Sequence, residues 1–377
     1  MASRQRCEAH KFLKNFRQGA IVTSMGEIGV AIVGCGYWGQ NLVRNFWELE
    51  EAKVQMVCDL DARLLARTLR RYPTVEPARD YQAALRDPGV EAVVLATPVS
   101  THYTFARQAL ESGKHVLVEK PLAQRAEEVL ELIELAERQR RTLMVDHTFL
   151  YTAAVRRMKQ LVDAGQLGDL LYYDSVRINL GLVQSDTNVL WDLGPHDFSI
   201  MDHLCGFDPV SVSAVAARHL DCPFENIAYV NVRFDSNLIA HFHLNWLAPV
   251  KVRLTLVGGS KKMLVYDDTE PSEKVKIYDR AITVAKNPER RARLLAGYRN
   301  GDMMAPQLDN TEALRLAARE FTSSIAEARP PLTDGSSAYR VVRLLEAAQQ
   351  SIEQNGREVE LGKPALPRSP RPEQVTV

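Results

Sequence analysis

Residues 30–39 read VAIVGCGYWG, and this stretch decides the first half of the fold. A buried apolar run leads into Gly34, Gly36 and Gly39, the spacing of the GxGxxG turn between a strand and a helix. In such a turn the first glycine permits the tight bend, the second lets the backbone approach a pyrophosphate, and the third lets helix and strand pack closely. The helix N-terminus then faces the anion. The stretch predicts a dinucleotide site that includes Tyr37 and Trp38, although a bare pattern of this kind also fits a glycine-rich turn.

An acidic residue supports the dinucleotide interpretation. Asp59 ends the next apolar run, 25 residues after Gly34. A carboxylate at about this spacing accepts hydrogen bonds from an adenosine ribose, and its charge repels a 2′-phosphate. We therefore predict NAD as the cofactor, with NADP as the less favoured alternative because Arg63 lies close in sequence.

Two kinds of sheet are predicted along the chain. Up to residue 150, short apolar runs alternate with amphipathic segments, which indicates an N-terminal Rossmann-type doubly wound parallel sheet. Its strands are expected over 28–33, 53–58, 91–96, 115–118 and 142–146. Beyond residue 150 the pattern indicates an α/β domain with a large, mostly antiparallel, open-faced sheet. Its elements are expected as a helix over 153–164, an extended segment over 170–179, strands between 209 and 278, and covering helices over 309–328 and 335–354.

Length and composition limit the number of domains and the classes of partner. The 377 residues suggest two domains. The predicted divisions are a disordered extension over 1–24, an NAD-binding domain over 25–150, a substrate-binding and oligomerisation domain over 151–363, and a disordered tail over 364–377. Because Lys plus Arg and Asp plus Glu both number 47, nucleic acid is not an expected partner. No apolar run is long enough for a membrane helix.

The cysteines indicate the redox state of the cellular compartment. Five cysteines are scattered along the chain without a CxxC pair. This spacing indicates neither a disulfide framework nor a zinc site, and it favours a reducing cytoplasm. His241 and His243 alternate on a predicted strand, but no third ligand accompanies them, so no metal is predicted.

Polar residues follow two predicted strands at their carboxyl ends, where ligands bind in doubly wound folds. Thr97, Pro98 and His102 follow the third strand, and Glu119 and Lys120 end the fourth. The proline after Lys120 fixes the backbone and suits a site where an ammonium must be aimed. The alternative is a surface Lys–Glu pair before a helix that begins with proline.

The second domain contributes WDLGPHD at residues 191–197. Asp192 and His196 are four residues apart, so they share one helix face if Pro195 opens a helix there. They would then converge on one ligand. The alternative is an N-capping aspartate with an incidental histidine.

In this order, the glycine motif, Asp59, the Thr97 to His102 stretch, Glu119-Lys120-Pro121 and Asp192-x-x-x-His196 resemble the Gfo/Idh/MocA oxidoreductases. The resemblance covers about residues 28 to 360. It implies a Rossmann domain that holds a nicotinamide cofactor, a second domain that supplies a sugar or cyclitol site, and a homodimer or homotetramer formed through the open sheet. It also implies that Lys120, Asp192 and His196 are catalytic, and that Thr97, Pro98, His102, Glu119 and Lys120 help to bind the cofactor.

Two further segments, VDHTFLY over 145–151 and NVLWDLGPHD over 188–197, look most like bacterial UDP-N-acetylglucosamine and UDP-N-acetylglucosaminuronate 3-dehydrogenases. One departure is Asp146, where many of these relatives have glycine. The resemblance thus implies oxidation of a sugar secondary alcohol, at C3 of a nucleotide sugar.

That reaction requires a base for the hydroxyl proton while hydride leaves for nicotinamide. His196 and Lys120 are both candidates for the base, and Asp192 is expected to orient the His196 ring. Tyr151, Arg177 and Asn179 are candidates for contact with a substrate carboxylate or diphosphate, against the alternatives of interdomain packing for Tyr151 and an exposed sheet face for Arg177 and Asn179. The rival functions are an NAD(P)H-dependent ketoreductase in deoxysugar assembly and a non-catalytic cofactor-sensing regulatory protein.

Overall fold

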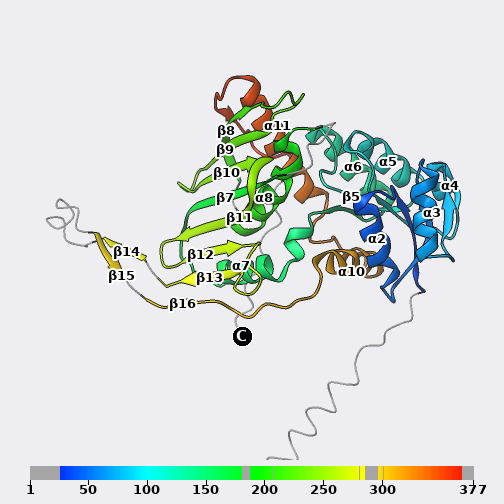
Figure 1. The fold of residues 1–377 in the computed structure, drawn as a ribbon, viewed down its shortest axis with the longest axis horizontal. Helices are drawn as coiled ribbons and strands as arrows, with labels where there is room; N and C mark the ends of the chain where they lie inside the picture. Colours follow the sequence, from blue (N-terminus) through cyan, green and yellow to red (C-terminus); the bar gives the residue numbers. More distant parts are fainter. Residues whose placement is uncertain are drawn as a thin grey trace, which may run out of the picture.

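The computed structural model describes residues 26–180, 187–206, 208–279, 281–284, 296–299 and 301–366. The expected disordered extension over 1–24 and residues 367–377 of the expected tail lie outside these ranges. The described chain builds two sheets that lie side by side, each with its own helices (Figure 1).

Six parallel strands form the first sheet in the order β3-β2-β1-β4-β5-β6. The strands are β1 (Ile28–Val33), β2 (Ala52–Cys58), β3 (Glu76–Ala78), β4 (Ala92–Leu95), β5 (His115–Glu119) and β6 (Leu143–Asp146). Every residue of β1 is buried, as an apolar central strand covered on both faces requires. The predicted doubly wound sheet is confirmed. Only β3 was missed, because its three residues, EPA, are too few and too polar to form an apolar pattern.

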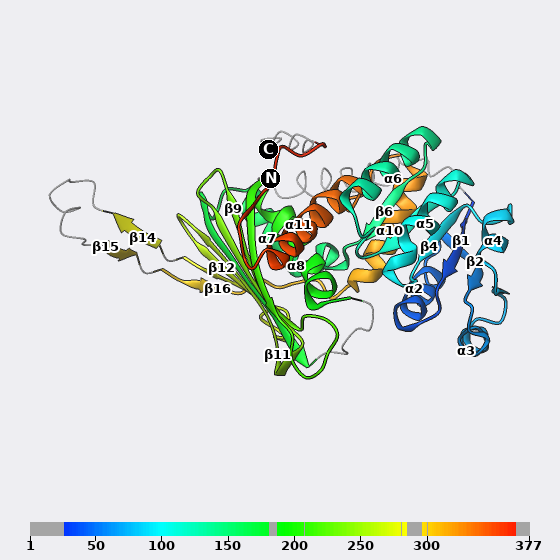
Figure 2. The same cartoon turned by 90° about the horizontal axis from the view of Figure 1, so that it is seen from above.

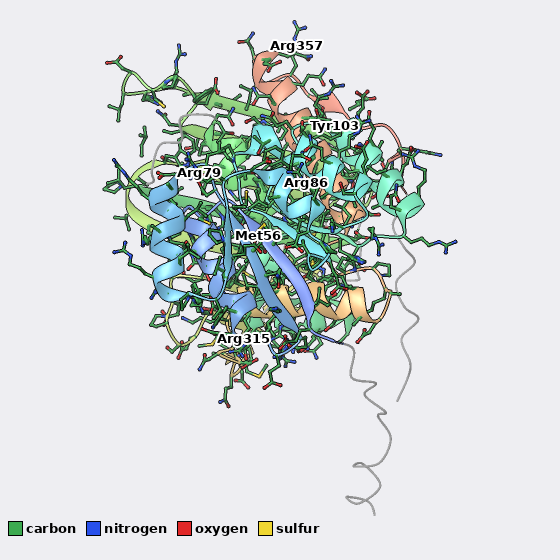
Figure 3. The ribbon with its side chains drawn as sticks, turned by 90° about the vertical axis from the view of Figure 1, so that its right-hand side faces the viewer. Met56, Arg79, Arg86, Tyr103, Arg315 and Arg357 are labelled. Carbon is green, nitrogen blue, oxygen red and sulfur yellow. The ribbon has the colours of Figure 1, made fainter. Side chains whose placement is uncertain are left out.

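Helices cover both faces of this sheet. They are α2 (Tyr37–Trp47), α3 (Ala62–Arg71), α4 (Tyr81–Arg86), α5 (Val99–Glu111) and α6 (Ala126–Gln139). Apolar residues of α2 and α3 enter one core, and those of α4, α5 and α6 enter the core on the opposite face. Figure 3 looks onto this half of the molecule: Met56, which is buried, lies near the middle of the view, and Arg79 and Arg86 lie above it.

Nine strands form the second sheet in the order β16-β13-β12-β11-β7-β10-β9-β8-β17. They are β7 (Leu170–Leu180), β8 (Pro209–Ala217), β9 (Ile227–Phe234), β10 (Ile239–Asn245), β11 (Leu247–Gly259), β12 (Met263–Asp267), β13 (Val275–Tyr278), β16 (Met303–Met304) and β17 (Val359–Glu360). The β7–β10 pair is parallel and the other pairings are antiparallel, which confirms the prediction of a mostly antiparallel sheet. A separate hairpin, β14 (Ala281–Val284) with β15 (Ala296–Arg299), projects beyond its edge (Figures 1 and 2).

The second sheet carries its helices on one face. The 3₁₀ helix η1 (Thr148–Tyr151) leads from β6 into α7 (Ala153–Asp163), and α8 (Val189–Cys205) packs beside it. Figure 2 shows α7, α8 and α11 (Gly335–Glu353) on the side of this sheet that faces the first one. In the described part of the chain no helix covers the other face.

Two late helices join the halves. Phe321 of α10 (Ala313–Ala326) packs against Phe46 of α2, so α10 belongs to the core of the first sheet. In contrast, α11 contacts α6 as well as α8 and β8. The two helices therefore connect the two sheets. They are the covering helices expected over 309–328 and 335–354.

Candidate active site

The glycine turn has the form that a pyrophosphate site needs. Gly34 has a φ of 94°, and a Cβ there would lie 2.3 Å from the Ala96 carbonyl oxygen. A Cβ on Gly39 would lie 1.8 Å from the Gly34 oxygen, so α2 approaches the turn too closely for any side chain. At Gly36 nothing lies within 4 Å of the same position, which leaves open space in front of the backbone.

The start of α2 is also suited to an anion. Gly36 is the N-cap and supplies no side-chain acceptor to the first N–H groups of the helix. Uncapped N–H groups at a helix N-terminus bind phosphates. Tyr37 and Trp38 begin the helix and are 80% and 48% exposed, so both rings are accessible at the turn.

Asp59 lies directly against the glycine turn. Its Oδ2 accepts from the Cys35 backbone N–H at 2.6 Å, and its Oδ1 accepts from the Asp61 N–H at 2.8 Å. A carboxylate has about four acceptor positions, so hydroxyl groups of a ribose still have acceptors on Asp59. The turn, the helix start and Asp59 together fit a dinucleotide.

The ends of β4 and β5 are linked by His102. The histidine is 1% exposed, and its Nδ1 and Nε2 each lie 2.8 Å from a backbone oxygen, of Pro121 and Thr97 respectively. Burial lowers the pKa of this ring. Both ring nitrogens point at backbone oxygens, and the neutral ring donates to one of them. His102 therefore lies between the Thr97-Pro98 turn and the Lys120-Pro121 turn, with neither nitrogen free to contact a ligand.

Lys120 reaches across from the first sheet to the second half of the chain. Its Nζ donates to the Asp192 carbonyl oxygen at 2.8 Å and to Asp192 Oδ1 at 3.0 Å. The peptide bond between Lys120 and Pro121 is cis. The other carboxylate oxygen of Asp192, Oδ2, accepts from Trp246 Nε1 at 3.1 Å. The motif lysine and the motif aspartate therefore meet, as the resemblance implies.

Helix α8 carries Asp192 and His196, but it does not begin at Pro195 as predicted. It begins six residues earlier, at Val189, because Asn188 caps it by accepting from the Trp191 N–H at 3.1 Å. Pro195 lies inside the helix. The expectation that the pair shares a helix face is unaffected, since residues four apart lie one turn above each other.

His196 is half-buried, and the Nδ1 edge of its ring is enclosed. Its Nδ1 is buried without a hydrogen-bond partner, and its ring meets the Phe149 ring edge-on with centroids 5.0 Å apart. Burial, reinforced by the Lys120 charge, lowers the pKa of His196 well below its ordinary value, so the ring is neutral at pH 7. The expectation that Asp192 orients this ring is wrong: Nδ1 has no partner, and the Asp192 oxygens accept from Lys120 and Trp246.

Two candidates for substrate contact have structural partners instead. Tyr151 is 5% exposed, its hydroxyl lies 3.0 Å from Thr333 Oγ1, and its ring packs in the core that α10 shares with the first sheet. Arg177 is 3% exposed and donates from Nε and Nη2 to the two oxygens of Asp197, both at 2.8 Å. It therefore faces the helix-covered side of the sheet and not the open face. Asn179 is half-buried near the end of β7.

One donor of Arg177 remains available. Its Nη1 is buried without a partner, and so is Nε of Arg253, which stands opposite Arg177 on β11. Both guanidinium groups approach the Phe149 ring, at 4.5 and 5.7 Å from its centroid. Since both charges also lie close enough to lower the pKa of His196, the two arginines border the same site.

Sequence reasoning missed three of these residues. Trp246, Phe149 and Arg253 contact Asp192, His196 or Arg177, yet no motif marks them. Phe149 lies within the quoted VDHTFLY segment, whereas Trp246 and Arg253 lie far from the motifs and no sequence signal identifies them. Only the pairing of β7, β10 and β11 brings them there.

A cavity of about 340 Å³ opens where the two halves meet, lined by Val99, Pro121 and Trp191 among others. It lies beside the Lys120 turn and the first turn of α8. A larger cavity, about 540 Å³, lies at the amino ends of β5 and β6, around His115 and Leu143. That is the opposite edge of the parallel sheet, so the larger cavity is separate from the site described above.

Several negative findings apply to the described residues. No group of three His, Cys, Asp or Glu side chains there has the arrangement to hold a metal ion. No helix in the described ranges is both long and apolar enough to cross a bilayer. The four cysteines in those ranges, Cys35, Cys58, Cys205 and Cys222, are free thiols.

Comparison with known families supports the geometric interpretation. Residues 28–147 match a family described as an oxidoreductase family with an NAD-binding Rossmann fold. Residues 155–265 match the GFO/IDH/MocA C-terminal domain.

Individual relatives are more distant. A glycosyl hydrolase family 109 protein from Shewanella is 31% identical over 170 residues, which are 43% of this chain and 37% of that protein. The inositol 2-dehydrogenase 2 of Saccharopolyspora erythraea is 30% identical over 51% of this chain and 58% of its own. The chain thus spans only part of the length of these curated relatives. Among solved structures, the UDP-N-acetylglucosamine 3-dehydrogenase of Acidithiobacillus ferrooxidans superposes with a TM-score of 0.75 at 24% identity, over 88% of this chain and 99% of that one, and so shares its fold.

Proposed function

Because the chain belongs to the Gfo/Idh/MocA oxidoreductase family, we propose that it is an NAD-dependent dehydrogenase that oxidises a secondary alcohol of a sugar, at C3 of a nucleotide sugar. The observation that carries the proposal is the contact between Lys120, from the end of β5, and Asp192, on α8, one turn from His196. An ammonium and a neutral imidazole from two halves of the chain then face one substrate.

NAD is the cofactor that the glycine turn and Asp59 favour. The turn and the N-terminus of α2 would hold the pyrophosphate, with Tyr37 and Trp38 beside it. The Asp59 carboxylate would accept from ribose hydroxyls and repel a 2′-phosphate, which argues against NADP. Thr97, Pro98 and Glu119 lie at the carboxyl ends of β4 and β5, where they would help to hold the cofactor, and His102 would act by fixing the two turns. When bound, NAD accepts the hydride.

His196 is our choice for the base. A neutral imidazole accepts a proton, and the low pKa that burial and Lys120 give His196 keeps it neutral at physiological pH. Lys120 would donate a hydrogen bond to the same hydroxyl oxygen and stabilise the alkoxide that develops as hydride leaves. Asp192 would act on Lys120, whose ammonium it holds, and not on His196.

The arginines favour a substrate with an anionic group. Arg177 Nη1 and Arg253 Nε are N–H donors without acceptors beside His196. Guanidinium groups match carboxylates and phosphates in geometry. A uronate carboxylate or a diphosphate near Phe149 would satisfy both donors, which supports a UDP-N-acetyl-hexosamine or its uronate as substrate. The shared fold with the Acidithiobacillus UDP-N-acetylglucosamine 3-dehydrogenase is compatible with that choice.

The open face of the nine-stranded sheet supports a homodimer or homotetramer. Val176, Leu254, Leu256 and Val265 lie on that face in adjacent register, and in the single chain they are half-buried. An apolar patch of this kind, here bordered by Asp174 and Asp267, is typical of a protein contact. The buried free thiols fit a cytoplasmic enzyme.

A panel of UDP- and TDP-sugars tests the function. The protein is incubated with each sugar and NAD, and NADH absorbance and product mass are followed. We expect NADH together with a ketosugar two mass units lighter than one nucleotide sugar. Reaction only of ketosugars with added NADH would assign the protein as a ketoreductase instead. Release of free sugar would indicate the glycoside hydrolysis named for the Shewanella relative. NAD binding without any turnover would favour a regulatory protein.

A further inference from the structure

Two carboxyl groups lie together behind Lys120, and one oxygen of each lacks a hydrogen-bond donor. Glu119 and Asp146 are direct neighbours in register on the parallel strands β5 and β6. Asp146 is 1% exposed, and Glu119 Oε1 is enclosed. Asp146 Oδ1 accepts from Thr148 Oγ1 at 2.7 Å, but Asp146 Oδ2 and Glu119 Oε1 have no hydrogen-bond partner.

Neither carboxyl group can be ionised at low cost while one of its oxygens lacks a donor. A buried ionised carboxylate without a donor costs several kcal/mol. Two such groups side by side also repel each other, as in the catalytic pairs of aspartic proteases, so one of them keeps its proton. A single proton between the two carboxyl groups gives each unpartnered oxygen a role, one as donor and one as acceptor.

We propose that Glu119 and Asp146 share one proton and act as a positioning pair, which places one negative charge behind Lys120 at neutral pH and two at alkaline pH. The pair does not touch the substrate. It acts through Lys120, whose backbone adjoins Glu119 and whose ammonium charge reaches both carboxyl groups. The catalytic part of this inference rests on the proposed function; the sharing of the proton does not.

Burial and mutual repulsion support the arrangement. Burial first, and the neighbouring Asp146 next, raise the pKa of Glu119 to about 8. Burial likewise raises the pKa of Asp146 above its ordinary value. The charged or titratable groups around the pair are Lys120 and, beyond it, Asp192, together with His147 on β6's continuation and Tyr151 of η1. His147 is neutral because burial lowers its pKa to about 3, so Lys120 is the nearby cation.

The amide variants D146N and E119Q test the shared proton. Each keeps the shape of the pair and gives the remaining carboxylate an amide donor, so both are expected to fold. Infrared spectra of the cofactor-free protein would be recorded from pH 5 to 10. We expect the wild type to show, at pH 7, the C=O stretch of a protonated carboxyl that disappears at alkaline pH. Both variants should lose this band at pH 7, because the remaining carboxylate no longer needs a proton. E346Q is the matched control: burial raises the pKa of Glu346 too, but this residue lies on α11, and its loss should leave the band of the pair unchanged.

Activity supplies the second test. With the sugar found in the panel, the wild-type profile of kcat/KM against pH should contain an ionisation near the alkaline pH at which the infrared band disappears. Both variants should lack this ionisation. The proton-sharing proposal is overturned if the wild type has no protonated-carboxyl band at pH 7, or if only one of the two variants removes it. If both variants keep the alkaline limb of the kcat/KM profile unchanged, the proposal that the pair acts through Lys120 is overturned. A clear infrared result without any sugar oxidation would instead refute the proposed function.

Discussion

At the scale of single residues, the site depends on what burial does to His196. A histidine in water titrates near pH 6.5, but here the pKa lies well below that value because the ring is desolvated beside Lys120. Because the ring stays neutral, its proton-accepting form persists to acidic pH. The ring is therefore free to accept a proton across the whole physiological range, as the proposed role of base requires.

This predicts the acid limb of the pH profile. We expect kcat/KM to show no His196 ionisation at pH 6.5 and to decline only at distinctly lower pH. In H196Q this limb should vanish and the rate should fall by about 10²- to 10⁴-fold, the usual contribution of a general base. Steady-state kinetics from pH 4.5 to 8 measure both. A wild-type limb centred at 6.5 would show instead that the ring is solvated and that another group is the base.

Some residues of the site could be predicted from the sequence and others could not. Lys120 and Asp192 were assigned to one site because both belong to recognised motifs, but their direct contact, at 3.0 Å, was not predicted. Arg177 was given the wrong surroundings, since alternation along a strand tells which residues share a face but not which face a helix covers. The partners of Arg177 and Asp192, namely Asp197 and Trp246, depend on tertiary packing that no local pattern encodes.

At the scale of elements, the glycine turn separates folding from cofactor binding. Gly34 needs its positive φ and its contact with the Ala96 oxygen, whereas a side chain on Gly36 meets open space. G34A should therefore lower the free energy of unfolding by about 1–2 kcal/mol or more, measured by urea titration.

G36V is the informative partner of that variant. It should unfold at the wild-type urea concentration but lose NAD binding, measured by calorimetry, because the valine fills the space intended for the pyrophosphate. Normal NAD affinity in G36V would place the cofactor elsewhere. The element itself was predictable from GxGxxG, but the start of α8 was not, since Pro195 is tolerated inside the helix and the Asn188 cap takes precedence.

At the scale of the whole molecule, the nine-stranded sheet leaves one broad face, with an apolar patch on β7, β11 and β12, without a covering helix in the described chain. The sequence predicted this sheet from its extended segments, but not the single parallel pair β7–β10 that places Trp246 beneath Asp192. Association through the face would remove Leu254, Leu256 and Val265 from water.

A charge on that face should separate the subunits. We expect L254E to elute as a monomer at concentrations where the wild type is a dimer or tetramer, as measured by light scattering, because burying an unpaired carboxylate opposes association. K251E, an exposed change on the same strand, is the control and should keep the wild-type mass. A monomeric wild type, or an L254E variant of unchanged mass, would contradict association through this sheet.

The most direct test of the account is a single-turnover measurement of NADH formation with saturating NAD and the sugar identified in the panel, comparing wild type with K120M. If an ammonium of one domain and an imidazole of the other act on the same hydroxyl, K120M should bind NAD with wild-type affinity and transfer hydride about 10²- to 10⁴-fold more slowly. A K120M variant that forms NADH at close to the wild-type rate would contradict the account.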